Sequence, residues 1–220
     1  MKDLIELTFN NSLEKLPSKK EINKMLFQKE SKILYSTYML PTTHKFNRPL
    51  MEQINIRSKY IKYSFPILSE EFILSIKDAV NKLGVKKIIE LSSGPGWLTF
   101  WLRKYGVNVY SCVDNYSWKS FLENDNYLPF VEKEDSRKIV RQEMDVDMFI
   151  LSWPYMNSVA AEIWKGMKKD QYLLYIGESD GGCTADEEFF KLTEDKYVKN
   201  IYFQLMNFEG VHDNCILYRK

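Results

Sequence analysis

Short apolar runs alternate with amphipathic segments over most of the chain, and each run ends at polar residues or at glycine. The runs of strand length are Ile88–Leu91, Val107–Val113, Met148–Leu151 and Tyr172–Ile176. Between them, apolar side chains recur every three or four residues, which is the spacing of a helix with one buried face. Strands that alternate with helices favour an α/β fold with a mostly parallel sheet flanked by helices.

The end of the chain has a different pattern. Two further apolar runs, Ile201–Met206 and Cys215–Tyr218, are separated by a loop that contains Gly210. This spacing predicts two strands without a helix between them. We therefore expect the sheet to close with an antiparallel hairpin.

Residues 1–66 are less regular. Ser18 and Glu21 form a capping box, and the apolar positions after them predict a helix to about Leu40, before Pro41. The stretch 42–66 reads as irregular and interleaves basic and aromatic residues, namely Arg48, Arg57, Lys59, Tyr60, Lys62 and Tyr63. These residues form either a surface for a phosphate-bearing partner or a loop whose tyrosines cover the core. We expect a helical and irregular extension over 1–66 and one α/β domain over 67–220.

Composition narrows the classes of function. The chain has 220 residues, 45% of them hydrophobic, which suffices for one domain with a large core. A net charge of +1 gives no strong field toward nucleic acid or an anionic membrane. No signal sequence or membrane-spanning run is recognisable, so we expect a soluble, cytoplasmic protein. The three cysteines are widely spaced and accompany only two histidines, which indicates neither a disulfide framework nor a metal site.

A glycine turn follows the first predicted strand of the domain. Gly94 and Gly96 stand between that strand and a helix, where glycine lets a ligand approach the main chain closely. The free amides at the start of the helix face a polar or anionic group. Asp114 ends the next strand, about 20 residues on, where an acid can accept both hydroxyls of a ribose. The alternative is a helix cap followed by an ordinary strand end.

The spacing around this turn separates two nucleoside cofactors. A dinucleotide turn needs a small residue at its third position, where this chain has Thr99, so NAD is disfavoured. Counted from the acid at the strand end, the sequence Glu90-Leu91-Ser92-Ser93-Gly94-Pro95-Gly96 resembles the E/D-x-G-x-G-x-G motif of class I S-adenosylmethionine-dependent methyltransferases. Ser92 replaces the first glycine of that motif. The resemblance covers residues from about 70 to 220.

This resemblance implies a Rossmann-like, seven-stranded sheet and S-adenosyl-L-methionine as the cofactor. It implies cofactor-binding roles for Glu90, Ser92, Gly94, Gly96, Asp114, Asn115 and Asp135. In the resembled family the glycines approach the amino-acid part of the cofactor, the acid after the second strand holds the ribose, and an acid such as Asp135 accepts from the adenine amino group. For Asp135 the alternative is an ordinary solvated loop carboxylate.

A second motif follows the apolar run that ends at Leu151. Ser152-Trp153-Pro154-Tyr155 is similar to the D/N/S-P-P-Y/F/W motif of methyltransferases that act on amide or exocyclic amino nitrogens, with Trp153 replacing the first proline. Such a nitrogen is a poor nucleophile because its lone pair is delocalised. The Ser152 hydroxyl and the Pro154 carbonyl can each accept an amino hydrogen, and the Tyr155 ring can stack on a planar substrate. The alternative is a strand that ends in a proline turn with buried aromatic residues.

Together these motifs predict an enzyme that transfers a methyl group to nitrogen. The substrate is left open between RNA, a protein amide and a small molecule. Duplex DNA is disfavoured because its enzymes extrude a base and grip phosphates, for which this near-neutral chain offers no obvious surface. The second hypothesis is a methyltransferase-like domain that binds the cofactor or a partner without turnover, since a fold does not imply a function.

Overall fold

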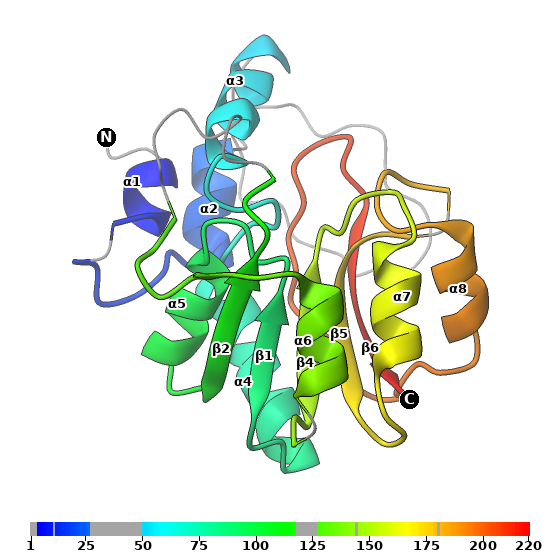
Figure 1. The fold of residues 1–220 in the computed structure, drawn as a ribbon. Helices are drawn as coiled ribbons and strands as arrows, with labels where there is room; N and C mark the ends of the chain where they lie inside the picture. The colour runs from blue at the N-terminus through cyan, green and yellow to red at the C-terminus, as the bar shows by residue number, and fades with distance from the viewer. Residues whose placement is uncertain (1–3, 11, 27–49, 118–126, 144, 180) are drawn as a thin grey trace.

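The computed structural model describes residues 4–10, 12–26, 50–117, 127–143, 145–179 and 181–220 (Figure 1). The helices are α1 (Leu4–Thr8), α2 (Lys19–Leu26), α3 (Leu50–Tyr60), α4 (Glu70–Leu83), α5 (Trp97–Lys104), α6 (Ser136–Gln142), α7 (Val159–Gly166) and α8 (Glu187–Thr193). The strands are β1 (Ile88–Leu91), β2 (Val109–Asp114), β3 (Glu132–Lys133), β4 (Met148–Ser152), β5 (Tyr172–Glu178) and β6 (Asp213–Arg219).

The strands form one six-stranded sheet in the order β3-β2-β1-β4-β5-β6. Every neighbouring pair from β3 to β5 is parallel, and β6 runs antiparallel to β5. The predicted α/β fold with an antiparallel end is therefore confirmed. The chain order reverses between β1 and β4, and in open α/β sheets ligands bind at the carboxyl ends of the strands beside such a switch point.

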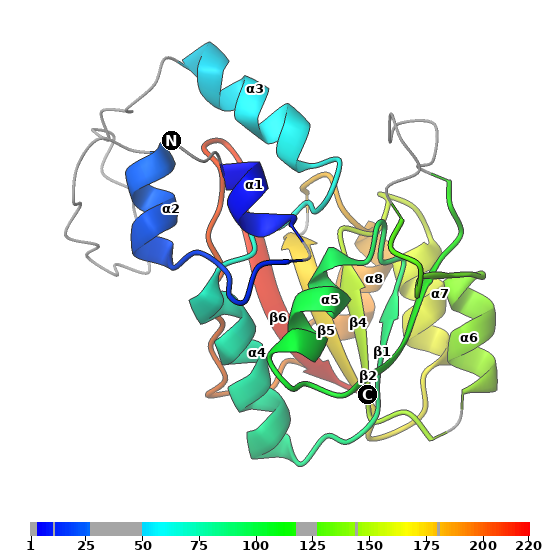
Figure 2. The same ribbon diagram turned by 90° about the vertical axis from the view of Figure 1, so that its left-hand side faces the viewer.

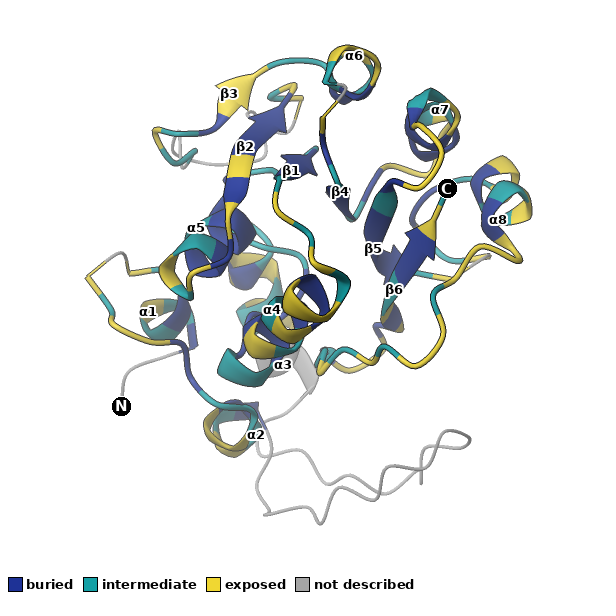
Figure 3. Ribbon diagram, turned by 90° about the horizontal axis from the view of Figure 1, so that it is seen from below, coloured by how far each residue is buried: buried dark blue, intermediate teal, exposed yellow. Residues whose placement is uncertain are grey.

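Helices cover both faces of the sheet because the central strands are apolar on both sides. On one face, Met148 and Ile150 of β4 pack with α4 and α5. On the other, Phe149 and Leu151 of the same strand pack with α6, α7 and α8. Figure 3 shows these strands buried between the two helix layers, whereas β3 at the sheet edge is exposed.

Residues of its own sequence cap helix α4 at both ends. The Ser69 hydroxyl accepts a hydrogen bond from the Phe72 amide at the N-terminus, and Gly84 ends the helix with φ of 65°. Five apolar side chains on one face are buried: Phe72, Ile73, Ile76, Ala79 and Val80. The helix therefore fixes the entry of the chain into β1.

The prediction of seven strands is wrong for the described residues. The segment Ile201–Met206 is not a strand of the sheet, although its apolar positions alternate in burial. Its partly buried apolar side chains belong to the core cluster that contains α4, and the Gln204 amide donates to the Ser75 hydroxyl of that helix at 3.1 Å. The alternation of partly buried and exposed residues in this segment thus arises from its packing against helix α4. A single bridge, Tyr197 to Tyr218, lies along the outer edge of β6.

The N-terminal helices gather near the carboxyl ends of the strands, on the side of α4 and α5 (Figures 1 and 2). The predicted capping box is present, with the Ser18 amide donating to Glu21 at 2.8 Å, and α2 follows it. The rest of the helix predicted to Leu40 lies outside the described residues, as does Arg48.

The stretch predicted to be irregular contains α3 instead. Its last residue, Tyr60, is fully buried and accepts a hydrogen bond from the Leu68 amide at 2.9 Å. The Tyr63 ring stacks on Phe9 at 4.6 Å. These tyrosines are therefore part of the packing, which supports the interpretation that they cover the core. Burial of Tyr60 against α2 is the tertiary contact that the local sequence pattern does not reveal.

Within the described part of the chain, no helix combines the length and apolarity needed to cross a membrane. The same residues contain no group of three or more histidine, cysteine or acidic side chains arranged to hold a metal ion.

Candidate functional site

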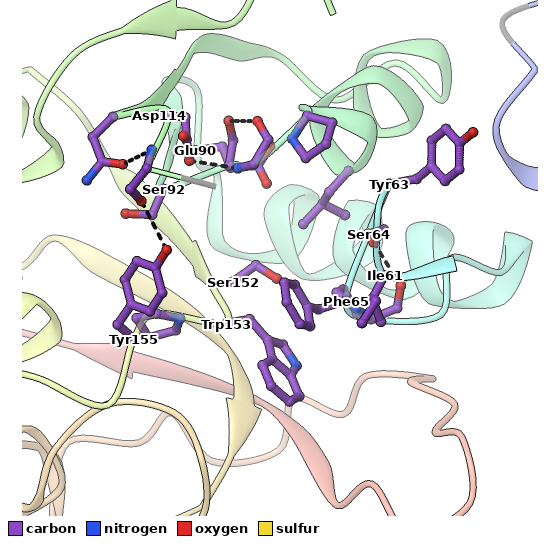
Figure 4. Close-up of a pocket in the computed structure, with 18 of the residues that line it drawn as sticks. Ile61, Tyr63, Ser64, Phe65, Glu90, Ser92, Asp114, Ser152, Trp153 and Tyr155 are labelled. Carbon is purple, nitrogen blue, oxygen red and sulfur yellow. Dashed lines mark hydrogen bonds between the residues drawn. The ribbon is translucent and has the colours of Figure 1, made fainter. Parts of the chain in front are cut away.

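A cleft opens at the carboxyl ends of β1, β2 and β4, beside the switch point of the sheet (Figure 4). It encloses about 830 Å³ of empty space, counted with its opening to solvent. Its lining residues come from a segment before α4, from the glycine turn, from the end of β2 and from the loop after β4. Most of the residues singled out from the sequence lie here: Glu90, Ser92, Gly94, Asp114, Asn115, Ser152, Trp153, Pro154 and Tyr155.

The glycine turn forms although serine replaces its first glycine. Ser92 has φ of 52°, in the left-handed region that favours glycine. Its amide donates to the Ser136 hydroxyl at 3.0 Å, and the two hydroxyls also lie 3.0 Å apart. Ser136 is the first residue of α6, so contact with the neighbouring helix stabilises the strained serine.

The two glycines of the turn have different surroundings. A Cβ atom on Gly94 would meet nothing within 4 Å, so this backbone is open toward the cleft. A Cβ atom on Gly96 would lie 2.5 Å from Val131, and Gly96 is not among the lining residues. Gly94 thus offers backbone to a ligand, whereas Gly96 lets the chain pass beside the loop before β3.

Glu90 places a buried carboxylate beneath the turn. Its Oε2 accepts from the amide of Thr99 at 3.1 Å and from the Thr99 hydroxyl at 2.5 Å. Its Oε1 is buried without a hydrogen-bond partner among the described residues. Burial raises the pKa of this carboxyl to about 7. A buried, unpaired acceptor oxygen in the lining of a cleft fits a ligand that brings a donor.

Thr99 therefore has a role that the sequence pattern did not reveal. The pattern identifies it only as a side chain too bulky for a dinucleotide turn, yet Thr99 is fully buried and both its donors reach Glu90. It stands in the first turn of α5, where backbone amides have no partner within the helix. An acid at the end of β1 and a threonine in the first turn of the next helix form a recognisable pair only once the turn is folded.

Asp114 lies at the end of β2 with both carboxylate oxygens engaged. Oδ2 accepts from the Gly94 amide at 2.9 Å, and Oδ1 accepts from the Tyr116 amide at 2.6 Å and the Tyr127 hydroxyl at 3.0 Å. Burial raises the pKa of this carboxyl, while these three donors act to lower it. The Tyr127 ring stacks on Tyr116 at 3.9 Å between centroids. No motif in the sequence points to Tyr127.

The motif after β4 lines the opposite side of the cleft from Asp114. The Ser152 hydroxyl has no hydrogen-bond partner among the described residues, whereas the Pro154 carbonyl accepts from the Ala185 amide at 3.3 Å. The Tyr155 side chain is 41% exposed, and its hydroxyl lies 3.0 Å from that of Ser117. Tyr155 is therefore not one of the buried aromatic residues that the alternative interpretation requires.

Trp153, which breaks the proline motif, is held by three contacts. Its amide donates to the Ile176 carbonyl at 2.7 Å, its indole Nε1 donates to Asp213 at 2.9 Å, and its ring stacks on Phe65 at 4.6 Å. Its φ of 50° is unusual for tryptophan. Neither Phe65 nor Asp213 was singled out from the sequence, because both come from segments distant from the motif.

The structure does not bring Asp135 to the cleft. This residue caps α6, accepts from the Arg137 amide, and pairs with the Arg137 guanidinium at 2.6 Å. The ion pair holds the pKa of the Asp135 carboxyl below its usual value. A carboxylate that satisfies its own helix fits the alternative of an ordinary loop acid. Asn115 does line the cleft, but its side-chain oxygen accepts from the Ser117 amide at 2.8 Å.

Comparison with models of known families and with curated protein sequences yields no match. Comparison with solved structures yields similar folds at low identity. TehB from Haemophilus influenzae is 16% identical with a TM-score of 0.42, over 76% of this chain and 67% of that one. Human N-acetylserotonin methyltransferase, solved with S-adenosylmethionine, is 14% identical with a TM-score of 0.44, over 77% and 56%. PigF, solved with S-adenosylhomocysteine (SAH), is 13% identical with a TM-score of 0.45, over 68% and 55%.

This chain therefore spans little more than half the length of two of these proteins. Likenesses of this strength do not assign a function, so the proposal below rests on the residues of the cleft.

Proposed function

We propose that the protein is an S-adenosylmethionine-dependent methyltransferase that acts on a nitrogen atom. The observation that carries the proposal is the meeting of two motifs in one cleft at the switch point. The glycine turn with Asp114 lines one side, and Ser152 to Tyr155 line the other. A ligand held by the first motif would thus present its reactive end to the second.

The residues of the turn fit the amino-acid end of this cofactor. The unpaired Oε1 of Glu90 offers an acceptor for an ammonium group. Gly94 leaves its backbone open toward the same space. Asp114, at the end of the neighbouring strand, is placed for the ribose.

The ribose can be bound only after one rearrangement. A carboxylate has about four acceptor directions, and on Asp114 three of them are already occupied by donors, so one is left. A ribose brings two hydroxyl donors. The Tyr127 hydroxyl is the donor that can leave, because the other two are backbone amides of the turns.

Replacement of Tyr127 by phenylalanine should therefore strengthen binding of SAH. The variant keeps the stacked ring and frees one acceptor direction on Asp114. We expect about a 3- to 10-fold gain in affinity, the worth of one modest hydrogen bond. Isothermal titration calorimetry measures it, with Tyr110→Phe as the control because Tyr110 is exposed and does not line the cleft. Weaker binding by Tyr127→Phe would show that the hydroxyl assists the ligand instead of competing with it.

The residues after Leu151 orient the nitrogen atom of the acceptor. The Ser152 hydroxyl can accept a hydrogen from an amino group, and the Pro154 carbonyl retains one lone pair beside its bond from Ala185. When bound, S-adenosylmethionine would supply a methyl group on a sulfonium: an N–C bond to the acceptor would form as the S–CH3 bond breaks, and SAH would leave as a neutral thioether. The chain's part is to align the nitrogen with that methyl group, and the nitrogen then releases its proton to water.

Binding without turnover is the second candidate. It is favoured by the two departures from the motifs, Ser92 and Trp153, which both adopt positive φ. Both departures are held by specific contacts, to Ser136 and to Asp213. Such contacts are compatible with either function, so a product assay is needed to separate them.

The test of the proposal has two stages. Calorimetric titration with S-adenosylmethionine, SAH and NAD should show binding of the first two and none of the third. Incubation with methyl-labelled cofactor and a cell extract should then give a labelled product. Binding of NAD without S-adenosylmethionine contradicts the proposal, and cofactor binding without any labelled product favours the second candidate.

Replacement of Tyr155 by alanine should abolish methyl transfer while leaving SAH affinity nearly unchanged. The ring is exposed at the mouth of the cleft, so its loss should change the free energy of unfolding by only about 0.5 kcal/mol. The Tyr155→Phe variant is the matched control, because it keeps the ring and loses the hydroxyl that lies 3.0 Å from that of Ser117. Melting temperature, SAH affinity and single-turnover rate should be measured on the same preparation. Normal turnover in Tyr155→Ala would exclude a stacking role for this ring.

A further inference from the structure

One wall of the cleft comes from a segment that precedes α4. Its lining residues are Ile61, Tyr63, Ser64, Phe65 and Pro66. Figure 4 shows Tyr63, Ser64 and Phe65 on the side of the cleft away from Ser92, with Trp153 between Phe65 and Tyr155. The segment therefore adjoins the motif that we propose orients the acceptor, and it lies away from the glycine turn.

This wall is fixed to the motif after β4. The Phe65 and Trp153 rings stack with centroids 4.6 Å apart and planes 13° apart. The indole is held in turn by Asp213 at the start of β6. Three segments distant in sequence thus fix this stacked pair, and side chains held in this way lose little conformational freedom when a planar group packs against them.

The charges around the cleft have one sign. The ionisable acids in its lining are Glu90 and Asp114, and the described lining residues include no lysine or arginine. Arg57 lies behind the Phe65–Trp153 pair, in a narrow adjoining cavity that it shares with Asp213. Burial raises the pKa of the Asp213 carboxyl to about 6, and the charge of Arg57 opposes that rise, so Arg57 is already engaged with an acid outside the cleft.

This distribution selects against an anion. A phosphate or carboxylate on an acceptor that packed against this wall would lose hydration and would find no lysine or arginine to pair with among the described lining residues. A planar group that is neutral or cationic meets no such cost. It can stack on the aromatic wall, and a cation gains further attraction from the ring faces.

We infer that residues 61–66 and Trp153 form the acceptor-binding wall, and that the group methylated there is planar and carries no negative charge. The inference rests on the proposed function and specifies its substrate class. Any phosphate or carboxylate of the acceptor must lie outside the cleft. The N-terminal part of the chain then sets substrate choice, while the sheet holds the cofactor.

Matched probes test the selection by charge. Benzamide and benzoate, and the amide and acid of quinoline-3-carboxylate, differ mainly in charge. Their binding to the full chain saturated with SAH is measured by ligand-observed NMR titration. We expect the amides to bind at least about tenfold more tightly than the acids, because only the acids bring an unpaired charge into the cleft.

Variants assign the effect to the wall. Phe65→Ala should weaken binding of the amides and leave SAH affinity unchanged. Tyr202→Ala, a change at an exposed tyrosine that does not line the cleft, should change neither affinity. Ile61→Lys adds a cation to the same wall and should make the acids bind. This gain is informative even if Phe65→Ala fails to fold.

The outcomes separate this inference from the proposed function. Equal or stronger binding of the acids, binding of neither member of a pair, or no gain in Ile61→Lys overturns the inference. SAH is titrated separately on the same protein. Failure of SAH to bind contradicts the proposed function, and the probes are then compared on the unloaded protein, where the same three outcomes decide the inference.

Discussion

Replacement of Asp114 by alanine is expected to weaken binding of SAH by about 10- to 100-fold, because hydrogen bonds to a charged acceptor contribute about 1.5–3 kcal/mol. The carboxylate stands at the end of β2, beside the open backbone of Gly94. The variant should also lose stability, because Asp114 accepts hydrogen bonds from Gly94, Tyr116 and Tyr127.

Loss of those three bonds should lower the free energy of unfolding of Asp114→Ala by about 1–3 kcal/mol, the cost of leaving partly buried donors unpaired. Affinity must therefore be measured below the melting transition of the variant. Tyr127→Phe serves as a partial control, since it removes one donor and keeps the carboxylate. A stable Asp114→Ala with unchanged affinity would exclude Asp114 from the site.

A modified ligand makes the test specific to ribose. SAH that lacks the ribose 2′- and 3′-hydroxyls should bind the unmodified protein more weakly than SAH does. In Asp114→Ala the two ligands should bind alike, because the acceptor for those hydroxyls is gone. If the variant still distinguishes the ligands to the same extent, another residue binds the ribose.

The parts of the site that the sequence could predict are those built within one strand–turn–helix unit. The turn from Glu90 to Pro95, the acid at the end of β2 and the motif that begins at the end of β4 all line the same cleft. They are predictable because parallel strands bring their carboxyl ends together regardless of the details of packing. The boundaries of α4 were predictable for a similar reason, since Ser69 and Gly84 act on their own helix.

The rest depends on contacts between distant segments. Phe65 meets Trp153, and Ser136 meets Ser92, only after the sheet and helices have packed. Asp135 differs in that local contacts decide its role. The resemblance places its carboxylate near the adenine, but in the structure this carboxylate caps its own helix and pairs with Arg137. Pattern analysis also cannot distinguish an extended segment on a helix from a strand, as Ile201–Met206 shows.

Replacement of Glu90 by glutamine should raise stability and lower ligand affinity at the same time. The carboxyl has a pKa of about 7 in the folded protein, because burial disfavours its charged form, against 4.5 as its ordinary value. Between these two values the folded state binds more protons than the unfolded state, so stability decreases as the pH rises from about 4.5 to about 7. At pH 8 the raised pKa of Glu90 therefore lowers the free energy of unfolding by its full amount, about 3 kcal/mol.

Glutamine cannot ionise, and its carbonyl oxygen can still accept from the amide and hydroxyl of Thr99. The variant should therefore match the unmodified protein near pH 4.5 and exceed its stability by up to about 3 kcal/mol at pH 8. Denaturant unfolding at several pH values measures this difference. A variant of equal stability at both ends of the range would show that the Glu90 carboxyl titrates normally in the folded protein.

Affinity should change in the opposite direction, because an ammonium group loses its charged acceptor when Glu90 becomes glutamine. We expect SAH to bind about tenfold more weakly at pH 8, the loss of a charge-assisted hydrogen bond. The unmodified protein should also bind more weakly as the pH falls below about 7, since its Glu90 is then protonated. A buried acid that destabilises the fold and strengthens the ligand is one retained for binding. If Glu90→Gln is more stable and binds SAH as tightly as before, the carboxylate does not contact the ammonium group, and the unpaired Oε1 needs another explanation.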